Sequence, residues 1–545
     1  MEKKPEPLDL SHYFSEMAKR RTESAITPFL QAVSSSVSNI GAGLPFPGNF
    51  PNDTLEGALG KVNRFPLHPV SPLSVPSSDT ERFTIPKFSS ISPASVDPKE
   101  EIDLASALQY QSSSGYPSLA AFIQDWAVNH QNQGKIPYAN PGTLISGGAG
   151  DGLAKCLMTF ADVGDNILVE EFVYFNAKDM ILPFGVGLVP VQLDNEGMSA
   201  KSLSHILEHW NEKKQGKKPH MMYTVTIGQN PTGGVLKLSR KNQLYKLCQE
   251  HDIVIFEDDP YWSEQCNIPV TPPSEFLASL VPSYLTIDVD GRVLSLQTFT
   301  KILAPGFRVG WIVAQPAFIE KLTFATNGTT SNPSGCSEVV LSQILLRDWG
   351  VKGFVRWIEG MRVNYEGRRN LLCEALAEGR DISIPIHTSA NYSEEKTLIR
   401  AYDFNIPSAG MYLWVRVDVS SHPLSHRPFS LPASKIILRL WQHLVGAPYS
   451  LLILPGNVFY ATPEVQKKFD EEKMGFFRLT YVAVEARDLT RIGEEFADGV
   501  KTFWEGEGWE ESTSEEEAEE DDGAEHYEVR KIARRYLNAR GAGRC

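Results

Sequence analysis

Lys301 is the first residue of this sequence that suggests covalent chemistry. It closes the apolar run of residues 294–301, lies next to hydroxyl side chains, and is followed shortly by Arg308. A lysine amine is a strongly hydrated cation, so a partly buried one at a strand end either forms an ion pair or attacks a carbonyl group. By themselves, these two residues favour an ordinary edge lysine beside a loop arginine.

Two further apolar runs end in polar residues that could act together with Lys301. Asp258 and Tyr261 come soon after residues 253–256, and Asn230 lies in the turn-like string of residues 228–233. A capping aspartate and a turn asparagine are the plainer interpretations. In parallel sheets, however, ligands bind outside the carboxyl ends of the strands. Three such strand ends together therefore predict one shared site.

Taken together and in this order, these residues resemble the class I and II, or fold type I, pyridoxal-phosphate aminotransferases. The resemblance is closest to the fungal aromatic amino acid and 2-aminoadipate (kynurenine) aminotransferase group. It rests mainly on residues 230–233 (Asn-Pro-Thr-Gly), Lys301 and Arg308, and it covers roughly residues 10–500. It implies pyridoxal 5′-phosphate as the cofactor, amino acids and 2-oxo acids as small-molecule substrates, and a homodimer with shared active sites.

The resemblance assigns the central chemistry to four residues. Lys301 would form the Schiff base with the cofactor and then carry a proton during transamination. Asp258 would bind the ring nitrogen, because a carboxylate there favours the protonated pyridine that accepts electrons. Asn230 and Tyr261 would hydrogen-bond the phenolic oxygen, and Asn230 would also border the substrate.

The cofactor phosphate requires positive charge and backbone amides. By resemblance, Thr298 and Arg308 are phosphate ligands. The turn containing Gly148, Ala149 and Gly150 would offer amides at the start of a helix that we expect near residue 153. The family usually has a hydroxyl residue and a second polar residue where this chain has Ala149 and Gly150. Only backbone contacts are therefore expected from this turn.

Four more residues are expected around the substrate and the subunit boundary. Tyr174 matches the aromatic residue that stacks on the cofactor ring, and Tyr110 matches the residue that reaches the neighbouring subunit's phosphate. Arg478 lies in an apolar strand pattern and matches the arginine that binds the substrate carboxylate through a bidentate fork. A structural salt bridge is the alternative for Arg478. Gly43 would let the N-terminal arm pass close over the substrate.

The elements that must position these residues alternate along the middle of the chain. Helix-period segments such as residues 239–250 separate apolar strand patterns at residues 166–171, 186–191, 220–226, 252–258, 292–300 and 309–314. This alternation predicts an α/β fold with a mostly parallel, mixed sheet between helices. A long helix over residues 351–376 leads into a smaller α+β lobe, with strands near residues 411–417, 451–454 and 475–481.

We expect four parts along the chain. Residues 1–98 form an N-terminal arm, helix-like over residues 9–30 and a loop over residues 54–98, that contributes to the small lobe and the substrate site. Residues 99–346 form the large cofactor-binding domain, and residues 347–505 form the small domain, with a polar insertion at residues 381–407. Residues 506–545 form an acidic tail that is expected to be disordered.

Composition restricts the partners. The 545 residues carry a formal charge of −15, concentrated in the acidic stretch 505–525, and no sequence-wide basic surface for nucleic acid is evident. No apolar run is long enough for a membrane span. The N-terminus resembles neither a secretory signal nor an organelle presequence, and the six cysteines lack metal or disulfide spacing. We therefore expect a cytoplasmic protein without a metal, nucleic-acid or membrane partner.

Three functions fit these features. The first is an aminotransferase that moves the amino group of an aromatic amino acid, 2-aminoadipate or kynurenine to 2-oxoglutarate by a ping-pong mechanism. The second is another fold type I enzyme, such as a β-lyase, a decarboxylase or a cyclopropane-forming synthase, because the cofactor holds the chemistry in common. The third is a non-catalytic aminotransferase-like regulator, but the stretch before Tyr110 shows no helix-turn-helix pattern. We expect the first.

Overall fold

A central sheet of seven strands organises the computed structural model, which describes residues 3–24, 41, 43–67, 78–89, 101–388, 391–426 and 430–506. The strand order is β3-β11-β10-β9-β8-β4-β5. β11 is antiparallel to both of its neighbours, and the remaining pairs are parallel. The strands are β3 (Gly142–Ser146), β4 (Asn166–Glu170), β5 (Gly187–Val191), β8 (Met221–Val225), β9 (Val254–Asp258), β10 (Val293–Thr298) and β11 (Gly310–Ala314).

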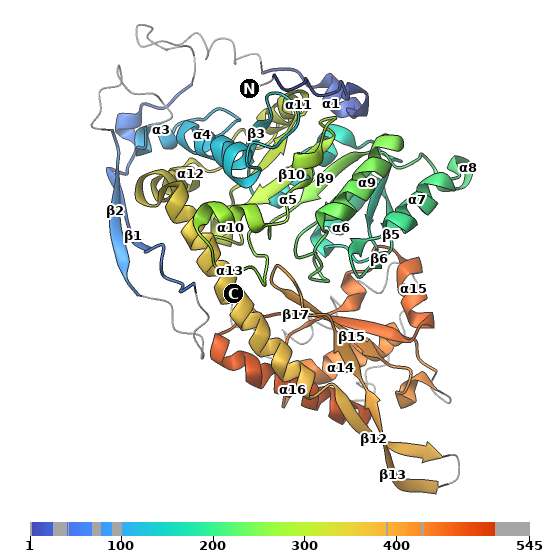
Figure 1. The fold of residues 1–545 in the computed structure, drawn as a ribbon. Helices are drawn as coiled ribbons and strands as arrows, with labels where there is room; N and C mark the ends of the chain where they lie inside the picture. Colours follow the sequence, from blue (N-terminus) through green and yellow to red (C-terminus); the bar gives the residue numbers. More distant parts are fainter. Residues whose placement is uncertain are drawn as a thin grey trace.

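Every residue of β8, β9, β10 and β11 is buried, so this part of the sheet is covered on both faces. Helices lie on each side of the sheet (Figure 1). These helices are α3 (Leu104–Ala107), α4 (Pro117–Asp125), α5 (Ala149–Phe160), α6 (Phe175–Ile181), α7 (Ala200–Glu208), α8 (Glu212–Gln215), α9 (Leu238–Glu250), α10 (Pro273–Ser279), α11 (Pro316–Asn327) and α12 (Gly335–Ser342). The mixed, mostly parallel sheet between helices confirms the expected fold class.

A second, four-stranded sheet has the order β14-β15-β17-β16 and is antiparallel throughout. The 29-residue helix α13 (Gly350–Glu378) runs from the central sheet to this region (Figure 1). The elements here are β14 (Tyr402–Phe404), β15 (Tyr412–Asp418), β16 (Leu454–Pro455), β17 (Met474–Thr480), α14 (Ala433–Val445), α15 (Pro463–Glu471) and α16 (Leu489–Trp504). Of the expected strand at residues 451–454, only Leu454 is in β16.

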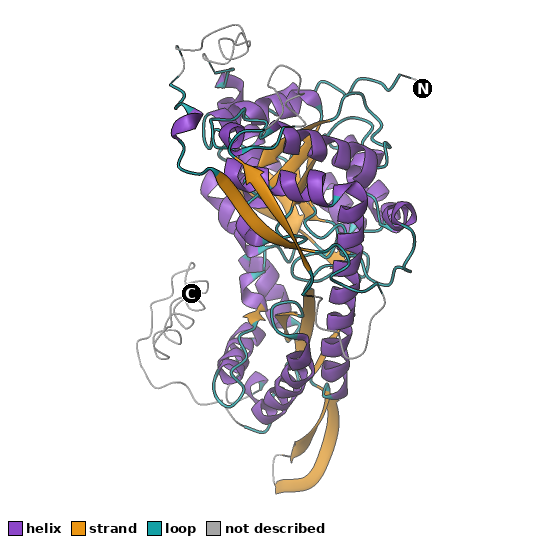
Figure 2. Cartoon of the chain, turned by 90° about the vertical axis from the view of Figure 1, so that its left-hand side faces the viewer, coloured by secondary structure: helices purple, strands orange, loops and turns teal. Residues whose placement is uncertain are grey.

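Two stretches that we expected to lack regular structure form β-hairpin ribbons. In the expected loop 54–98, β1 (Thr54–Gly60) pairs antiparallel with β2 (Thr80–Pro86). In the expected unpatterned insertion, β12 (Asp381–Thr388) pairs with β13 (Asn391–Arg400), and this hairpin projects from the body of the protein (Figures 1 and 2). Both predictions were wrong because a two-stranded ribbon with largely exposed faces needs no continuous apolar run, so its backbone pairing leaves little hydrophobic signal.

Three smaller expectations also change. The N-terminal helix-like stretch contains only a 3₁₀ turn and the short helix α1 (Glu16–Arg20) before residues 25–30, which lie outside the described residues. Strand β3 was not anticipated, and two further short strands, β6 (Leu193–Asp194) and β7 (Gly197–Met198), pair with each other. Helix α5 begins at Ala149 rather than near residue 153. The expected acidic tail lies outside the described residues beyond Gly506.

No helix in the described part of the chain combines the length and the apolar character needed to cross a membrane.

Candidate active site

A cavity of about 520 Å³ opens at the carboxyl ends of β8, β9 and β10. Its lining contains most of the residues that the sequence singled out: Ala149, Gly150, Tyr174, Asn230, Asp258, Tyr261, Thr298, Lys301 and Arg308. Lys301 and Asp258, which come from different strand ends, therefore face one enclosed space. This convergence follows from the parallel order of the strands, which brings their carboxyl ends to one edge of the sheet.

Asp258 is buried and only half satisfied. Its Oδ2 accepts a hydrogen bond of 2.7 Å from the Tyr223 hydroxyl, whereas its Oδ1 has no partner among the described residues. Burial raises the pKa of Asp258 to about 6, against the opposing effects of the Tyr223 hydrogen bond and the positive charge of Lys301. A buried carboxylate oxygen that is left without a donor and faces a cavity is suited to receive one from a ligand.

Arg478 is hydrogen-bonded to Asn230, which lines the cavity. The Arg478 Nη1 donates to Asn230 Oδ1 at 2.7 Å. The guanidinium carbon lies 4.1 Å from the ring centroid of Tyr412 and 4.9 Å from that of Phe459, so aromatic rings hold the arginine through cation–π contacts. Within the described ranges Arg478 forms no ion pair with a carboxylate, which disfavours the structural salt bridge considered as the alternative.

Arg308 joins the lysine loop to the start of helix α5. Its Nη2 donates to the carbonyl oxygen of Gly147 at 3.0 Å, and its Nη1 lies 3.5 Å from the Thr300 hydroxyl. Gly148, the residue before the helix, has φ 99°, and a Cβ there would lie 2.6 Å from Arg308 Nη2. The glycine is therefore required both for the backbone conformation and for the close approach of the guanidinium. A helix N-terminus beside an arginine is suited to bind an anion.

Ala149 and Gly150 form the first turn of α5 and line the cavity without polar side chains. A Cβ built on Gly150 would meet only Met180 at 3.9 Å, which is an ordinary contact distance. Two hydroxyl groups of the cavity lining come from the lysine loop, where Thr298 Oγ1 and Thr300 Oγ1 are 2.8 Å apart. The backbone-only role predicted for the 148–150 turn is consistent with this geometry.

Tyr174 and Tyr261 bring aromatic hydroxyls to the cavity. Tyr174 directly precedes α6, is half-buried, and accepts a hydrogen bond of 2.7 Å from the Asn176 side chain. Tyr261 is buried, and its ring lies edge-on to that of Tyr412 with centroids 6.0 Å apart. Burial and then the neighbouring Tyr412 hydroxyl raise the pKa of Tyr261, so its hydroxyl remains a proton donor at neutral pH.

Sequence reasoning missed three residues of the site: Tyr223, Thr300 and Tyr412. A signal existed for Tyr223, which carries a polar group at the end of a largely apolar side chain in the buried strand β8. It lies two residues before Val225, the residue of β8 that pairs with Asp258, and therefore on the same face of the sheet as Asp258. Thr300 directly precedes Lys301 and could have been included with Thr298. Tyr412 is far from the others in sequence, and only the docking of β15 places it in the cavity.

Four predicted residues are not in the lining of this cavity. Gly148 directly precedes the lining residues Ala149 and Gly150, Arg478 contacts the lining residues Asn230 and Tyr412, and Tyr110 and Gly43 are exposed. Tyr110 is 70% exposed, and the side chain of its neighbour Gln109 donates to the carbonyl oxygen of Pro45 at 2.7 Å. Gly43 is exposed, and a Cβ built there would meet nothing within 4 Å. The role of Gly43 over the substrate therefore stays a prediction.

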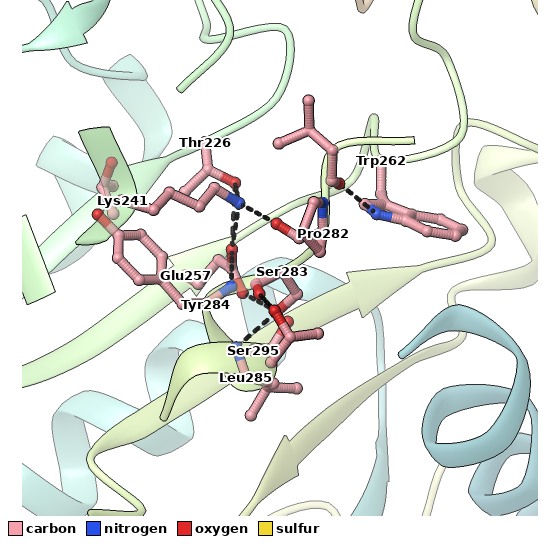
Figure 3. Close-up of polar contacts among 12 residues, drawn as sticks. Thr226, Lys241, Glu257, Trp262, Pro282, Ser283, Tyr284, Leu285 and Ser295 are labelled. Carbon is pink, nitrogen blue, oxygen red and sulfur yellow. Dashed lines mark hydrogen bonds and ion pairs between the residues drawn. The ribbon is translucent and has the colours of Figure 1, made fainter. Parts of the chain in front are cut away.

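The opposite face of β9 carries a fully buried ion pair, which Figure 3 shows. Lys241 Nζ lies 2.9 Å from Glu257 Oε1, and neither side chain is exposed. The lysine also donates to the Thr226 hydroxyl at 3.1 Å and to the Pro282 carbonyl at 2.9 Å. Glu257 accepts further hydrogen bonds from the side chains of Thr226 and Ser283 and from the backbone amide of Tyr284. This network stabilises strand β9 on the face opposite to Asp258.

The groups left without partners in the cavity fit pyridoxal phosphate. The buried Asp258 Oδ1 can accept the proton of a pyridinium nitrogen, and the Lys301 amine faces the same space. At the other end, Arg308, Thr300 and the amides after Gly148 provide positive charge and donors for a phosphate. A ring carrying a phosphate on one side and an aldehyde on the other therefore finds a matching partner for each group.

Comparisons with known proteins agree with this geometry. A family model described as aminotransferase class I and II matches residues 96–495. An aromatic amino acid aminotransferase of Schizosaccharomyces pombe is 30% identical, covering 91% of this chain and 98% of the relative. An L-tyrosine:2-oxoglutarate aminotransferase of Tapinella panuoides is 30% identical, covering 77% of this chain and 76% of the relative.

The solved structures include an aminotransferase of Candida albicans that is 30% identical, with a TM-score of 0.77, covering 92% of this chain and 100% of that chain. The matched family region includes Lys301, Asp258, Asn230 and Arg478. The family, the fold and the contents of the cavity point to the same conclusion. This chain belongs to the class I and II aminotransferase family.

Proposed function

We propose that this aminotransferase takes its amino group from an aromatic amino acid and passes it to 2-oxoglutarate by a ping-pong mechanism, with 2-aminoadipate and kynurenine as further candidate donors. Relatives with the corresponding names support the donor class, including the S. pombe and T. panuoides enzymes and a bovine kynurenine/alpha-aminoadipate aminotransferase. The observation that carries the proposal is that Lys301, the half-satisfied Asp258 and Asn230 line one cavity, with Arg478 hydrogen-bonded to Asn230.

The cofactor of the family is pyridoxal phosphate, which when bound supplies an electron sink and a temporary carrier for the amino group. The residues of this chain supply the remaining functions. Asp258 Oδ1 accepts a proton-bearing ring nitrogen, and the Tyr223 hydrogen bond fixes the carboxylate orientation. Lys301 would hold the cofactor through its aldehyde group, and its amine would move one proton as a general base.

Arg478 is the proposed ligand of the substrate carboxylate. Asn230 occupies one guanidinium nitrogen, and the Tyr412 and Phe459 rings fix the plane of the group. Burial lowers the pKa of Arg478, which shows that its charge is poorly solvated and would gain from an anionic partner. The aromatic surroundings also exclude water, which strengthens the attraction between the arginine and a carboxylate.

At the phosphate end, we propose that Arg308, Thr298 and Thr300 act with the amides of Gly148, Ala149 and Gly150. Tyr174 is the proposed stacking partner of the ring. Tyr261 and Asn230 are the proposed donors to the phenolic oxygen. These roles rest on the positions of the residues in the cavity and on the family resemblance.

We also propose a homodimer in which Tyr110 completes the partner's phosphate site. Leu44, Phe46, Phe88 and Tyr110 are between 41% and 70% exposed. The segments that carry them are joined by hydrogen bonds, from Gln109 to the Pro45 carbonyl and from Ala105 to the Lys87 carbonyl. A gathering of exposed aromatic side chains is typical of a subunit interface. A second copy of the chain is the occupant that would explain both the patch and Tyr110.

The division into an arm (1–98), a large domain (99–346), a small domain (347–505) and an acidic tail (506–545) is part of this proposal, as is a cytoplasmic location. The two sheets, with α13 between them, support the boundary near residue 347. Limited proteolysis of the purified protein followed by mass spectrometry would test these boundaries.

The reaction is tested with the purified enzyme, pyridoxal phosphate and a panel of amino donors. We expect the cofactor absorbance to change on adding tyrosine, phenylalanine or tryptophan and to recover with 2-oxoglutarate, with glutamate formed in equal amount. Recovery only with other oxo acids would overturn the acceptor, and a preference for 2-aminoadipate or kynurenine would overturn the donor class. Release of ammonia or carbon dioxide instead would indicate a β-lyase or a decarboxylase, and cofactor binding without any turnover would indicate a regulator.

A further inference from the structure

Asp259 is a buried acid that the proposed mechanism does not use. It follows Asp258 and faces the same side of the sheet as Glu257, because side chains alternate along an extended chain. Asp259 has no exposed surface, and neither of its carboxyl oxygens has a hydrogen-bond partner among the described residues. A buried carboxyl group without a partner is costly, so a missing partner is expected.

The nearby donors are already engaged. The three N–H groups of Lys241 are directed at Thr226, Glu257 and the Pro282 carbonyl. The Thr226 hydroxyl donates to Glu257. Burial, and then the charge of Glu257, raise the pKa of Asp259 well above its usual range, against the opposing effects of the Lys241 charge and the Thr226 hydroxyl, and this favours the neutral acid. Asp259 therefore needs a hydrogen-bonding partner rather than a counterion.

A cavity of about 20 Å³ adjoins Asp259. Gln131 and Trp311 line the same cavity, and both are buried. Gln131 Oε1 and Trp311 Nε1 also have no hydrogen-bond partner within the described ranges. The cavity is thus surrounded by an N–H donor from Trp311, an amide oxygen from Gln131 and the carboxyl group of Asp259. A polar cavity of roughly 10–15 Å³ or more is large enough for one water molecule.

We propose that this cavity is a binding site for one internal water molecule, which accepts a hydrogen bond from Trp311 Nε1 and donates to Gln131 Oε1 and Asp259. A water molecule can accept and donate at the same time, so one molecule gives each of the three side chains a hydrogen-bond partner. A metal ion fits less well, because the indole N–H would point its proton toward the cation. The site is separate from the cofactor cavity, and Pro260 and Thr298 line both of them.

The cavity that would hold the water lies between the two loops that carry the active-site groups. Pro260 and Ser263 line its cavity from the loop that includes Asp258 and Tyr261. Thr298 and Ile302 line it from the loop that includes Lys301, and the Trp357 indole fixes the Ile302 carbonyl at 2.7 Å. The water would join Asp259, from the loop that carries Asp258 and Tyr261, to Trp311 of β11, which pairs with Gln297 of β10 ahead of Lys301. Asp259, Gln131 and Trp311 are accordingly positioning residues for the proposed reaction, because they support these elements without touching the substrate.

The first test is a crystal structure of the pyridoxal-phosphate-loaded enzyme at a resolution that shows ordered water. We expect one water molecule between the three side chains, and none in the double variant Trp311→Phe, Gln131→Leu. An empty cavity in the wild-type enzyme would overturn the proposal. This readout does not require turnover, so it stands even if the proposed substrates are wrong.

The second test is the affinity of the cofactor-free variants for pyridoxal phosphate, measured by absorbance or fluorescence titration. The double variant should bind the cofactor between roughly twofold and tenfold more weakly, the range expected for one net hydrogen bond. Asp259→Asn should stay near the wild type because an amide both donates and accepts, whereas Asp259→Leu should not. Tyr138→Phe is the matched control, since it removes a buried hydroxyl without a partner among the described residues, far from this cavity.

Equal cofactor affinity of the double variant and Tyr138→Phe would show that the water has no positioning role and would overturn that part of the proposal. Failure of the wild-type enzyme to bind pyridoxal phosphate would instead contradict the proposed function. A loss of thermal stability alone, with unchanged affinity, would assign the water to folding rather than to the active site.

Discussion

Glu257 and Asp258 are neighbours on strand β9, and they face opposite sides of the sheet. Glu257 is fully buried, and both of its carboxylate oxygens are engaged, by Lys241, Thr226, Ser283 and the Tyr284 amide. Within the described ranges Asp258 accepts a hydrogen bond from Tyr223 at Oδ2, and its Oδ1 has no donor, although the residue lines a cavity of about 520 Å³.

The difference between these two carboxylates separates a structural role from a chemical one. A buried charge with a complete set of partners gains nothing from a ligand, and its loss is felt in folding. A buried charge with an unused oxygen carries a desolvation cost that a ligand can relieve. The back face of β9, which carries Glu257, therefore stabilises the fold. The front face, which carries Asp258, can bind the cofactor.

The largest expected effect is on the front face, at Lys301. Lys301→Ala should lower the transamination rate by at least about 10⁴-fold, or about 5.5 kcal/mol, because both the nucleophile and the proton carrier are lost. Single-turnover absorbance measurements with an amino acid donor would test this, with thermal unfolding as the control for folding. Full activity of the variant would remove Lys301 from the mechanism.

The next effect is on the back face, where Lys241→Met should destabilise the fold by about 3–5 kcal/mol. Removing the lysine leaves Glu257 buried without its counterion. Urea unfolding measures this loss. The rate per folded, cofactor-loaded enzyme should change far less than in Lys301→Ala. If instead the rate collapses while stability is kept, the separation between the two faces of β9 is wrong.

Asp258 should make the cofactor-free enzyme less stable as the pH rises, which is the opposite of the usual effect of a carboxyl group. Its pKa in the folded state is about 6, above its usual value of 3.8, so between these values the folded state binds more protons than the unfolded chain. Its contribution to stability is therefore complete below pH 3.8 and is lost as the pH rises through 6, by about 3 kcal/mol.

Asp258→Asn should remove this part of the pH dependence. Urea unfolding of both cofactor-free proteins between pH 4 and 7 would show it as a difference between the two curves, because all other groups are common to them. Parallel curves would mean that Asp258 is not desolvated in the folded protein.

The smallest effects compare one hydroxyl on each face. Tyr223→Phe removes the donor to Asp258, and Ser283→Ala removes a donor to Glu257. Each should cost about 1 kcal/mol of stability. Only Tyr223→Phe should also weaken pyridoxal phosphate binding and slow turnover, since it frees the carboxylate that meets the ring. Equal kinetic effects of the two variants would contradict the distinction.

The elements of the central sheet could be predicted from the sequence because each carries its own signal. The apolar runs at residues 220–226, 252–258 and 292–300 fell on β8, β9 and β10 to within a few residues. Strand β3, with only a short apolar segment, and the ribbons at β1–β2 and β12–β13 were not predicted. These elements depend on pairing with distant segments, which a local pattern does not record.

The sequence by itself determined the family, the cofactor and the strand ends that supply Asn230, Asp258 and Lys301, because those residues lie in short motifs that can be recognised from their neighbours in the sequence. Only the tertiary structure decided what each polar group touches. It placed Tyr412 beside Arg478, satisfied Glu257 while leaving its neighbour half free, and left Asp259, Gln131 and Trp311 around one small cavity. The physical reason is that hydrogen-bond satisfaction depends on packing between segments far apart in the chain, whereas strand periodicity and turn chemistry are local.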